Sequence, residues 1–190
     1  FPKAKFYFSS TPGIGSYFLS KMASMYCRLA SSKVGLQVFE FLREKDPSFV
    51  LEMDVYSTSL WINKDTNLLG LLAKDLISTA PNHYITWSVI GNYYSLNGMP
   101  KESTTCLMKS LSILENPFAY SLLGFEFNIR SQYLEAQNYF KSSLCMLENN
   151  DKANFGLGVA YSETSKRAAA EAYFKKALAI NPSNLNMKAF

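Results

Sequence analysis

The chain has 190 residues, of which 48% are hydrophobic and 18% are charged, and its formal net charge is +4. This composition is too hydrophobic for a disordered chain, no apolar run approaches the ~20 residues of a membrane-spanning helix, and no block of like charges indicates a nucleic-acid or anionic-membrane surface. The cysteines are odd in number and far apart, at Cys27, Cys106 and Cys145, which favours reduced thiols. We therefore expect a protein of the nucleus and cytoplasm.

The first segment, residues 1–15 (FPKAKFYFSSTPGIG), is predicted to be an irregular leader. Its apolar run is short and is broken by Ser and Pro, unlike that of a secretory signal. The stretch GIGSYF at 13–18 begins like a dinucleotide-binding glycine motif, but Phe18 takes the place of the third glycine and no strand is predicted before it. It therefore predicts only a turn that leads into a helix.

From residue 16 onward, a small residue between two large ones recurs at a nearly constant interval. The steps between successive small residues are 34, 34, 33 and 34 residues, and the positions are Ala23, Ser57, Gly91, Gly124 and Gly158. A period in this range is typical of a helix-turn-helix repeat. The small residue lets the two helices of a unit approach closely. We predict an array over 16–184 and a tail at 185–190, with units at 16–49, 50–83, 84–116, 117–150 and 151–184.

The last unit carries the fullest pattern. Its small, large and closing residues are Leu157, Gly158, Tyr161, Ala170, Phe174, Ala177 and Pro182. Pro182 ends the second helix, as Pro47 and Pro81 do in two earlier units, because a residue before proline is disfavoured in the α region. This spacing resembles the tetratricopeptide repeat. The resemblance implies an all-α, right-handed tetratricopeptide-repeat solenoid of about five helix-turn-helix repeats.

No catalytic or metal-binding signature stands out in the sequence. The single histidine, His83, lies in a predicted loop with no serine or cysteine motif around it, and we interpret it as a solvated loop residue. The three cysteines fall in three different units, which does not favour a shared metal. We expect no enzyme, no cofactor and no metal.

Several blocks go beyond a generic repeat. MDVYSTSLW (53–61), VIGNYYSL (89–96) and AEAYFKKALAINP (170–182) resemble the repeat array of the cell-division-cycle twenty-seven subunit of the anaphase-promoting complex. The sister subunit named for cell-division-cycle twenty-three shares some of these blocks and is the second choice, because Trp61 and the Ala-Leu-x-Ile-Asn-Pro ending favour the first. In this comparison, Ser110 and Ser143 stand where the family has small alanines.

That resemblance implies a non-catalytic scaffold subunit of a ubiquitin ligase that works in mitosis. The implied partners are other subunits of the complex and activator tails that end in isoleucine-arginine, received in the concave groove of the array. It also implies that a homodimer would form through parts outside this chain.

Residues on the first helix of each unit that are not needed for packing are predicted to face a concave groove. The candidate peptide-binding residues are Asp54, Thr58, Trp61, Asn92, Leu96, Phe125, Asn128, Ile129, Phe155 and Glu163.

The chemistry of these residues suits the capture of an extended peptide. Asn92 and Asn128 can bond peptide main-chain groups, apolar residues such as Trp61 can hold an isoleucine-like side chain, and Asp54, Glu126 or Glu163 can pair with arginine. The alternative is a co-chaperone-like module that binds acidic carboxy-terminal tails. That module needs several groove cations, and the inferred groove has only Arg28 and Lys152.

Overall fold

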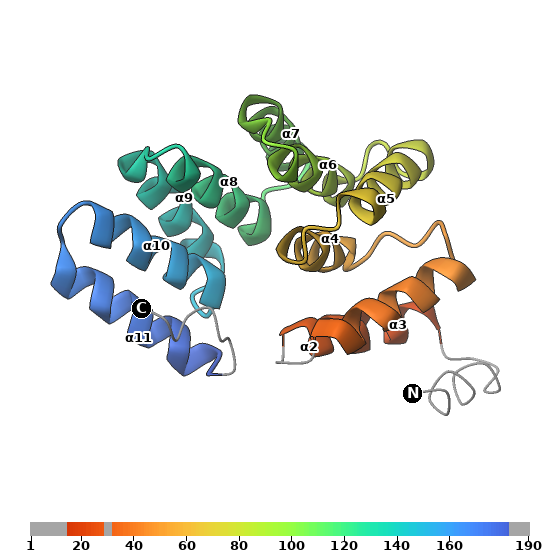
Figure 1. Ribbon diagram of the computed structural model, residues 1–190, viewed down its shortest axis with the longest axis horizontal. Coiled ribbons are helices and arrows are strands. Elements are labelled where there is room, and N and C mark those ends of the chain that lie inside the picture. Colours follow the sequence, from red (N-terminus) through yellow and green to blue (C-terminus); the bar gives the residue numbers. More distant parts are fainter. Residues whose placement is uncertain (1–14, 29–31, 183–190) are drawn as a thin grey trace.

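The computed structural model describes residues 15–28 and 32–182, and this part of the chain is all helical (Figure 1). The predicted leader, apart from Gly15, and the predicted tail lie outside the described residues, and the boundaries of the five units stay a prediction. Ten helices follow one another: α2 (Ser16–Arg28), α3 (Ser32–Lys45), α4 (Met53–Ile62), α5 (Thr66–Thr79), α6 (Tyr84–Leu96), α7 (Pro100–Ile113), α8 (Pro117–Ile129), α9 (Tyr133–Met146), α10 (Asp151–Glu163) and α11 (Arg167–Ile180).

The helices form a solenoid that curves into an open ring (Figure 1). Helices α4, α6, α8 and α10 are the inner row, since each contacts the next, and α5, α7, α9 and α11 are the outer row. The curvature brings the last helix back to the first. Asn181 Nδ2, just after α11, donates hydrogen bonds to the carbonyl oxygen of Arg28 at 3.3 Å and to Asp151 Oδ2 at 2.9 Å.

Glycines mark the closest approaches between paired helices. A Cβ atom built on Gly91 would lie 2.7 Å from the Leu107 side chain, and one on Gly124 would lie 2.6 Å from the Phe140 ring. Such distances leave no room for a side chain. The first contact joins α6 to α7, and the second joins α8 to α9. The prediction that small residues let the two helices of a unit approach closely is therefore confirmed at Gly91 and Gly124.

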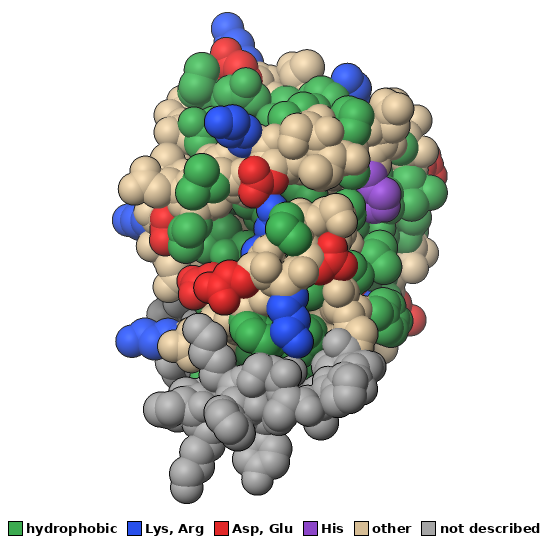
Figure 2. All heavy atoms as spheres, turned by 90° about the vertical axis from the view of Figure 1, so that its right-hand side faces the viewer, with side chains coloured by type: hydrophobic (Ala, Val, Ile, Leu, Met, Phe, Trp, Pro, Cys, Tyr) green, Lys and Arg blue, Asp and Glu red, His purple; other side chains and the backbone are tan. Residues whose placement is uncertain are grey.

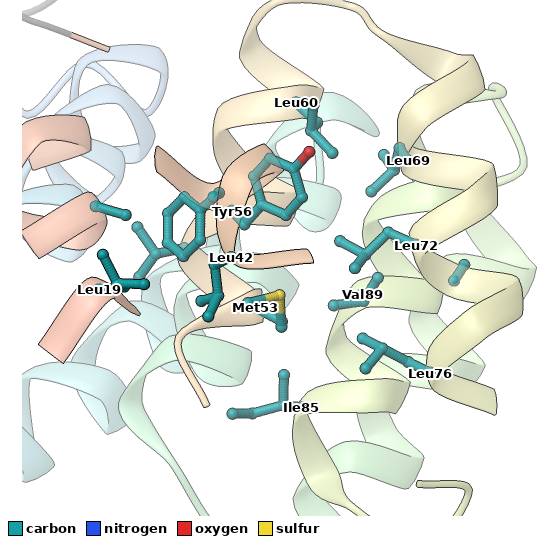
Figure 3. Close-up of a cluster of buried hydrophobic side chains, with 14 residues drawn as sticks. Leu19, Leu42, Met53, Tyr56, Leu60, Leu69, Leu72, Leu76, Ile85 and Val89 are labelled. Carbon is teal, nitrogen blue, oxygen red and sulfur yellow. The ribbon is translucent and has the colours of Figure 1, made fainter. Parts of the chain in front are cut away.

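Two apolar clusters fill the spaces between the helices. The first joins α2 to α6, and Figure 3 shows Met53 and Tyr56 of α4 beside Leu72 and Leu76 of α5 and Val89 of α6. The second is built around Phe140, which is fully buried between α8, α9 and α10. Unit 50–83 is thus stabilised by burial against both of its neighbours.

In two units, serine side chains take the place of small apolar residues where the second helix packs against the start of the first helix. Ser110 Oγ donates to the carbonyl oxygen of Tyr84 at 2.9 Å and lies 2.9 Å from Ser88 Oγ. The same arrangement recurs one unit later, where Ser143 Oγ donates to the carbonyl oxygen of Pro117 at 2.7 Å. Because each hydroxyl finds a partner, a serine at the alanine position is tolerated in the core.

Side-chain caps start several inner helices. The Asn116 side chain accepts from the Ala119 amide, and Asn150 accepts from the Ala153 amide, so both are standard N-caps. His83 takes this place before α6, where its Nδ1 accepts from the Ile85 amide at 3.2 Å. His83 lies in a loop, as interpreted from the sequence, but it is partly buried and its imidazole satisfies a free amide of the helix end.

The cap by His83 makes stability depend on pH. Burial lowers the pKa of His83 below its ordinary value of 6.5, so the unfolded chain binds the proton more tightly. The contribution to stability is full above pH 6.5 and is lost as the pH falls from there through the lower pKa of the folded protein. We expect the free energy of unfolding to fall by less than about 1 kcal/mol, the size of one cap, between pH 7.5 and 5.5.

Urea unfolding at both pH values measures this change. His83→Asn keeps a capping side chain that does not titrate in this range. The variant should therefore lose less stability on acidification, and an equal loss in both proteins would contradict the role of His83.

One face of the outer surface carries both charged and hydrophobic side chains. Figure 2, which shows the right-hand side of Figure 1, has charged side chains of both signs scattered among hydrophobic ones. None of the described helices has both the length and the apolarity needed to cross a bilayer. The distinctive feature of the molecule lies instead on its concave side.

Candidate peptide-binding site

A cavity of about 470 Å³ opens on the concave side of the solenoid, between the four inner helices. Its wall is mainly apolar and includes three phenylalanines, with amide and hydroxyl groups interspersed. The lining residues are Thr58, Trp61, Ile62, Asn92, Ser95, Phe118, Ser121, Leu122, Phe125, Glu126, Asn128, Ile129, Asn150, Lys152, Phe155 and Val159.

The curvature of the array brings seven of the ten sequence-predicted residues onto this wall: Thr58, Trp61, Asn92, Phe125, Asn128, Ile129 and Phe155. The other three lie elsewhere. Leu96 packs against the first apolar cluster, because burial of its side chain favours the junction of α4 and α6. Glu163 is exposed in the last turn of α10, where its charge stays hydrated. Asp54 is in the first turn of α4, with a carboxylate oxygen 2.9 Å from the Val55 amide.

Polar side chains on the wall also tie neighbouring inner helices together. Asn92 Nδ2 donates to Ser57 Oγ at 2.9 Å, and Trp61 Nε1 donates to Ser95 Oγ at 3.1 Å, so both bonds join α4 to α6. Asn92 Nδ2 also lies 3.4 Å from Thr58 Oγ1, so both of its N–H groups have partners within the protein. Its predicted role as a donor to a peptide would require one of these bonds to break.

Asn128 is differently placed. Its Nδ2 donates to the carbonyl oxygen of Gly156 at 3.1 Å, which joins α8 to α10. Its Oδ1 is buried and has no hydrogen-bond partner among the described residues. A buried acceptor without a donor is unfavourable, so the free oxygen is a position where an N–H group of a ligand would be stabilised.

The apolar part of the wall consists of phenylalanine rings that pack against the core and of an exposed isoleucine side chain. Phe125 packs edge-on against Phe140, with 5.1 Å between ring centroids, and Phe155 packs on Phe174 at 5.7 Å. Ile129 is 62% exposed although it lines the cavity. The rings are thus held by the core, while Ile129 has most of its surface available to a partner.

Comparison with known proteins identifies the repeat. A tetratricopeptide repeat profile matches residues 151–184, which contain α10 and α11. The thermophilic TPR protein TTC0263 of Thermus thermophilus has a TM-score of 0.73 at 15% identity, over 92% of this chain and 96% of the other. The chain is a tetratricopeptide-repeat solenoid.

Curated relatives of the solenoid include subunits of the anaphase-promoting complex and cell-division-cycle proteins. Anaphase-promoting complex subunit 3 of Schizosaccharomyces pombe is 28% identical over 169 residues, which are 88% of this chain and 25% of the relative. Cell division cycle protein 27 homolog B of Arabidopsis thaliana is 30% identical over 172 residues, 88% of this chain and 23% of the relative. The sequence resemblance to the cell-division-cycle twenty-seven subunits is confirmed, and the solenoid spans about a quarter or less of the length of these relatives.

A structure from the same complex agrees in fold. The crystal structure of the APC/C hetero-tetramer Cut9-Hcn1 has a TM-score of 0.57 at 20% identity, over 94% of the solenoid and 42% of that chain. At this identity the likeness bears on the fold alone.

Two charged residues lie on the cavity wall of the solenoid. Glu126 is buried, and burial raises the pKa of its carboxyl group, although a hydrogen bond from Ser95 and the charge of Arg130 act against the increase. Burial lowers the pKa of the Lys152 ammonium, with Asp151 and Asp54 acting against the decrease. In the segments that the structure describes, no group of three or more His, Cys, Asp or Glu side chains could hold a metal.

The sequence pattern contained a signal for six further wall residues, because positions 2, 5, 9, 12 and 13 of each unit are the ones predicted to face the groove. These residues are Ile62, Ser95, Phe118, Ser121, Lys152 and Val159. Asn150 had no such signal, since it lies before α10 and reaches the wall as its N-cap. Leu122 had no signal in the sequence either, because it is the sixth residue of its unit, a position that is not assigned to the groove.

Proposed function

We propose that the solenoid is a peptide-binding scaffold module of an assembly related to the anaphase-promoting complex, and that its cavity holds the extended tail of another subunit or of an activator. The observation that carries this proposal is the cavity itself, which combines an apolar wall with the buried, unpartnered Asn128 Oδ1. An extended segment offers main-chain N–H groups for such an oxygen and side chains for the apolar wall. The resemblance to subunits of that complex supplies the class of assembly.

A tail ending in isoleucine-arginine suits part of this wall. Phe125, Phe155 and Ile129 offer apolar contacts for the isoleucine side chain. Of the acids considered for the arginine, only Glu126 lines the cavity, and it is already held by Ser95 and faced by Arg130. Arginine recognition is therefore the weaker part of the fit, and we expect affinity in the micromolar range, typical of a short segment with few anchors.

Titration calorimetry with an acetylated hexapeptide ending in isoleucine-arginine tests this function. Ile129→Ala should weaken binding by about tenfold, since covering its exposed surface contributes roughly 1 to 2 kcal/mol. Leu134→Ala is the matched control, because Leu134 is 65% exposed but lies on the outer helix α9. Equal effects of the two variants, or tighter binding of an acidic chaperone-type tail, would contradict the proposal.

A further inference from the structure

A group of basic and aromatic side chains lies where α9, α10 and α11 meet. The rings of Tyr161 on α10 and Tyr173 on α11 stack, with 5.5 Å between their centroids and 17° between their planes. The ammonium groups of Lys141 and Lys166 lie 5.9 and 5.7 Å from the centroid of the Tyr161 ring. That of Lys176 lies 5.5 Å from the centroid of the Tyr173 ring. We call these three lysines and two tyrosines the lysine cluster, and none of the five lines the cavity.

The charges of the lysine cluster are not neutralised within the part of the chain that the structure describes. All three lysines are exposed, and none of them forms an ion pair there. Glu171 on α11 already pairs with Lys175, and Glu163 on α10 lies outside ion-pair distance of the cluster. The distances to the rings are close to the ~6 Å limit of a cation–π contact, so the rings attract the ammonium groups only weakly. Because three like charges repel one another, an anion at this position would be stabilised.

The preceding unit shows the same stack with a cation that serves the fold. Phe127 and Tyr139 stack with 5.0 Å between their centroids, and the Arg130 guanidinium lies 5.2 Å from the centroid of the Phe127 ring. Arg130 Nη2 also donates to the carbonyl oxygen of Pro100 at 2.6 Å, which joins the end of α8 to the start of α7. In the lysine cluster three charges take the place of one, and no such bond to a carbonyl oxygen holds them in the described segments.

We propose that the lysine cluster docks a segment of another protein that is rich in aspartate and glutamate. Lysines on flexible stems suit separate carboxylates, whereas a phosphate group is better matched by the planar fork of arginine. A nucleic-acid base needs a free ring face on which to stack, and Tyr161 and Tyr173 cover each other. Their hydroxyl groups supply further hydrogen-bond donors to a carboxylate.

This surface is separate from the proposed peptide-binding cavity. The turn between α10 and α11, where Lys166 is the N-cap of α11, lies at the outer rim of the ring, on the left in Figure 1. An acidic segment docked there leaves the cavity open. The inference therefore goes beyond the proposed function, and the solenoid can hold a tail and an acidic segment at the same time.

Fluorescence anisotropy with a labelled decapeptide of alternating glutamate and serine tests the inference. The peptide is amidated and has no apolar side chain, so it does not imitate the tail proposed for the cavity. Raising the salt concentration from about 50 to about 300 mM should weaken binding at least fivefold, because exposed charges are screened. The same peptide with glutamine in place of glutamate should show no binding.

Protein variants assign the binding to the cluster. Lys141→Gln, Lys166→Gln and Lys176→Gln should each weaken binding of the glutamate peptide by about threefold, the size of one exposed ion pair, and together by at least tenfold. Lys74→Gln is the matched control, because it removes the same charge from an exposed position on α5, and it should leave the affinity unchanged. Ile129→Ala, which alters the cavity wall, should also leave it unchanged.

The remaining outcomes would overturn the inference. Equal effects of Lys74→Gln and of the cluster variants would mean that the peptide responds only to the net charge of the solenoid. Tenfold tighter binding of a phosphoserine peptide or of a single-stranded oligonucleotide would make the class of partner wrong. If the glutamate peptide does not bind, the lysine cluster is not a docking surface, while the proposed function is decided separately by the peptide that ends in isoleucine-arginine.

Discussion

Replacing Phe140 by alanine is expected to lower the free energy of unfolding by roughly 3 to 5 kcal/mol, the range for a fully buried phenylalanine. The Phe140 ring is 0% exposed and lies against the backbone of two other helices, at Gly124 of α8 and at Gly156 of α10. It also supports the ring of Phe125 on the cavity wall. One side chain on an outer helix therefore holds two inner helices in place.

Urea unfolding followed by circular dichroism measures this effect. The matched control is Leu134→Ala on the same helix, where the side chain is 65% exposed and the change should stay within about 0.5 kcal/mol. Because repeats stabilise one another through their interfaces, the transition of Phe140→Ala should also become less cooperative. A loss below about 1 kcal/mol would mean that the ring does not join the three helices.

Replacing Gly124 by leucine is expected to destabilise the solenoid by at least ~2 kcal/mol through overpacking. A Cβ atom at this position would lie 2.6 Å from the Phe140 ring, which has no free space to move into because it is fully buried. Gly15→Ala is the control, since nothing lies within 4 Å of a Cβ built on Gly15. An unchanged melting temperature of Gly124→Leu would show that α8 and α9 do not meet at this glycine.

A double-mutant cycle makes the same contact quantitative. If the Phe140 ring is the obstacle, Gly124→Leu should destabilise the Phe140→Ala protein much less than it destabilises the natural chain, since the leucine then fills the space that the ring has left. Additive effects of the two substitutions would place the strain of Gly124→Leu elsewhere.

The sequence by itself determined the repeat architecture of this protein. The spacing of Gly91, Gly124 and Gly158 was sufficient because a helix presents one stripe to its partner, and residues a few positions apart decide how close that partner can come. The sequence also predicted where a helix ends before a proline, since α5 ends at Thr79, shortly before Pro81. The same periodicity marked most of the cavity wall, including Trp61 and Phe155.

Only the tertiary structure decided which groups meet across the ring. Periodicity treats all units alike, so it assigned Glu163 to the groove together with Ile129, although only Ile129 lies on the cavity wall. It could not show that Asn92 is held by Ser57, or that the Lys152 ammonium lies over the Phe118 ring. These outcomes depend on the small rotation from each helix pair to the next, which accumulates along the array until Asn181 reaches Arg28, a contact between residues too far apart in sequence for any local pattern to encode.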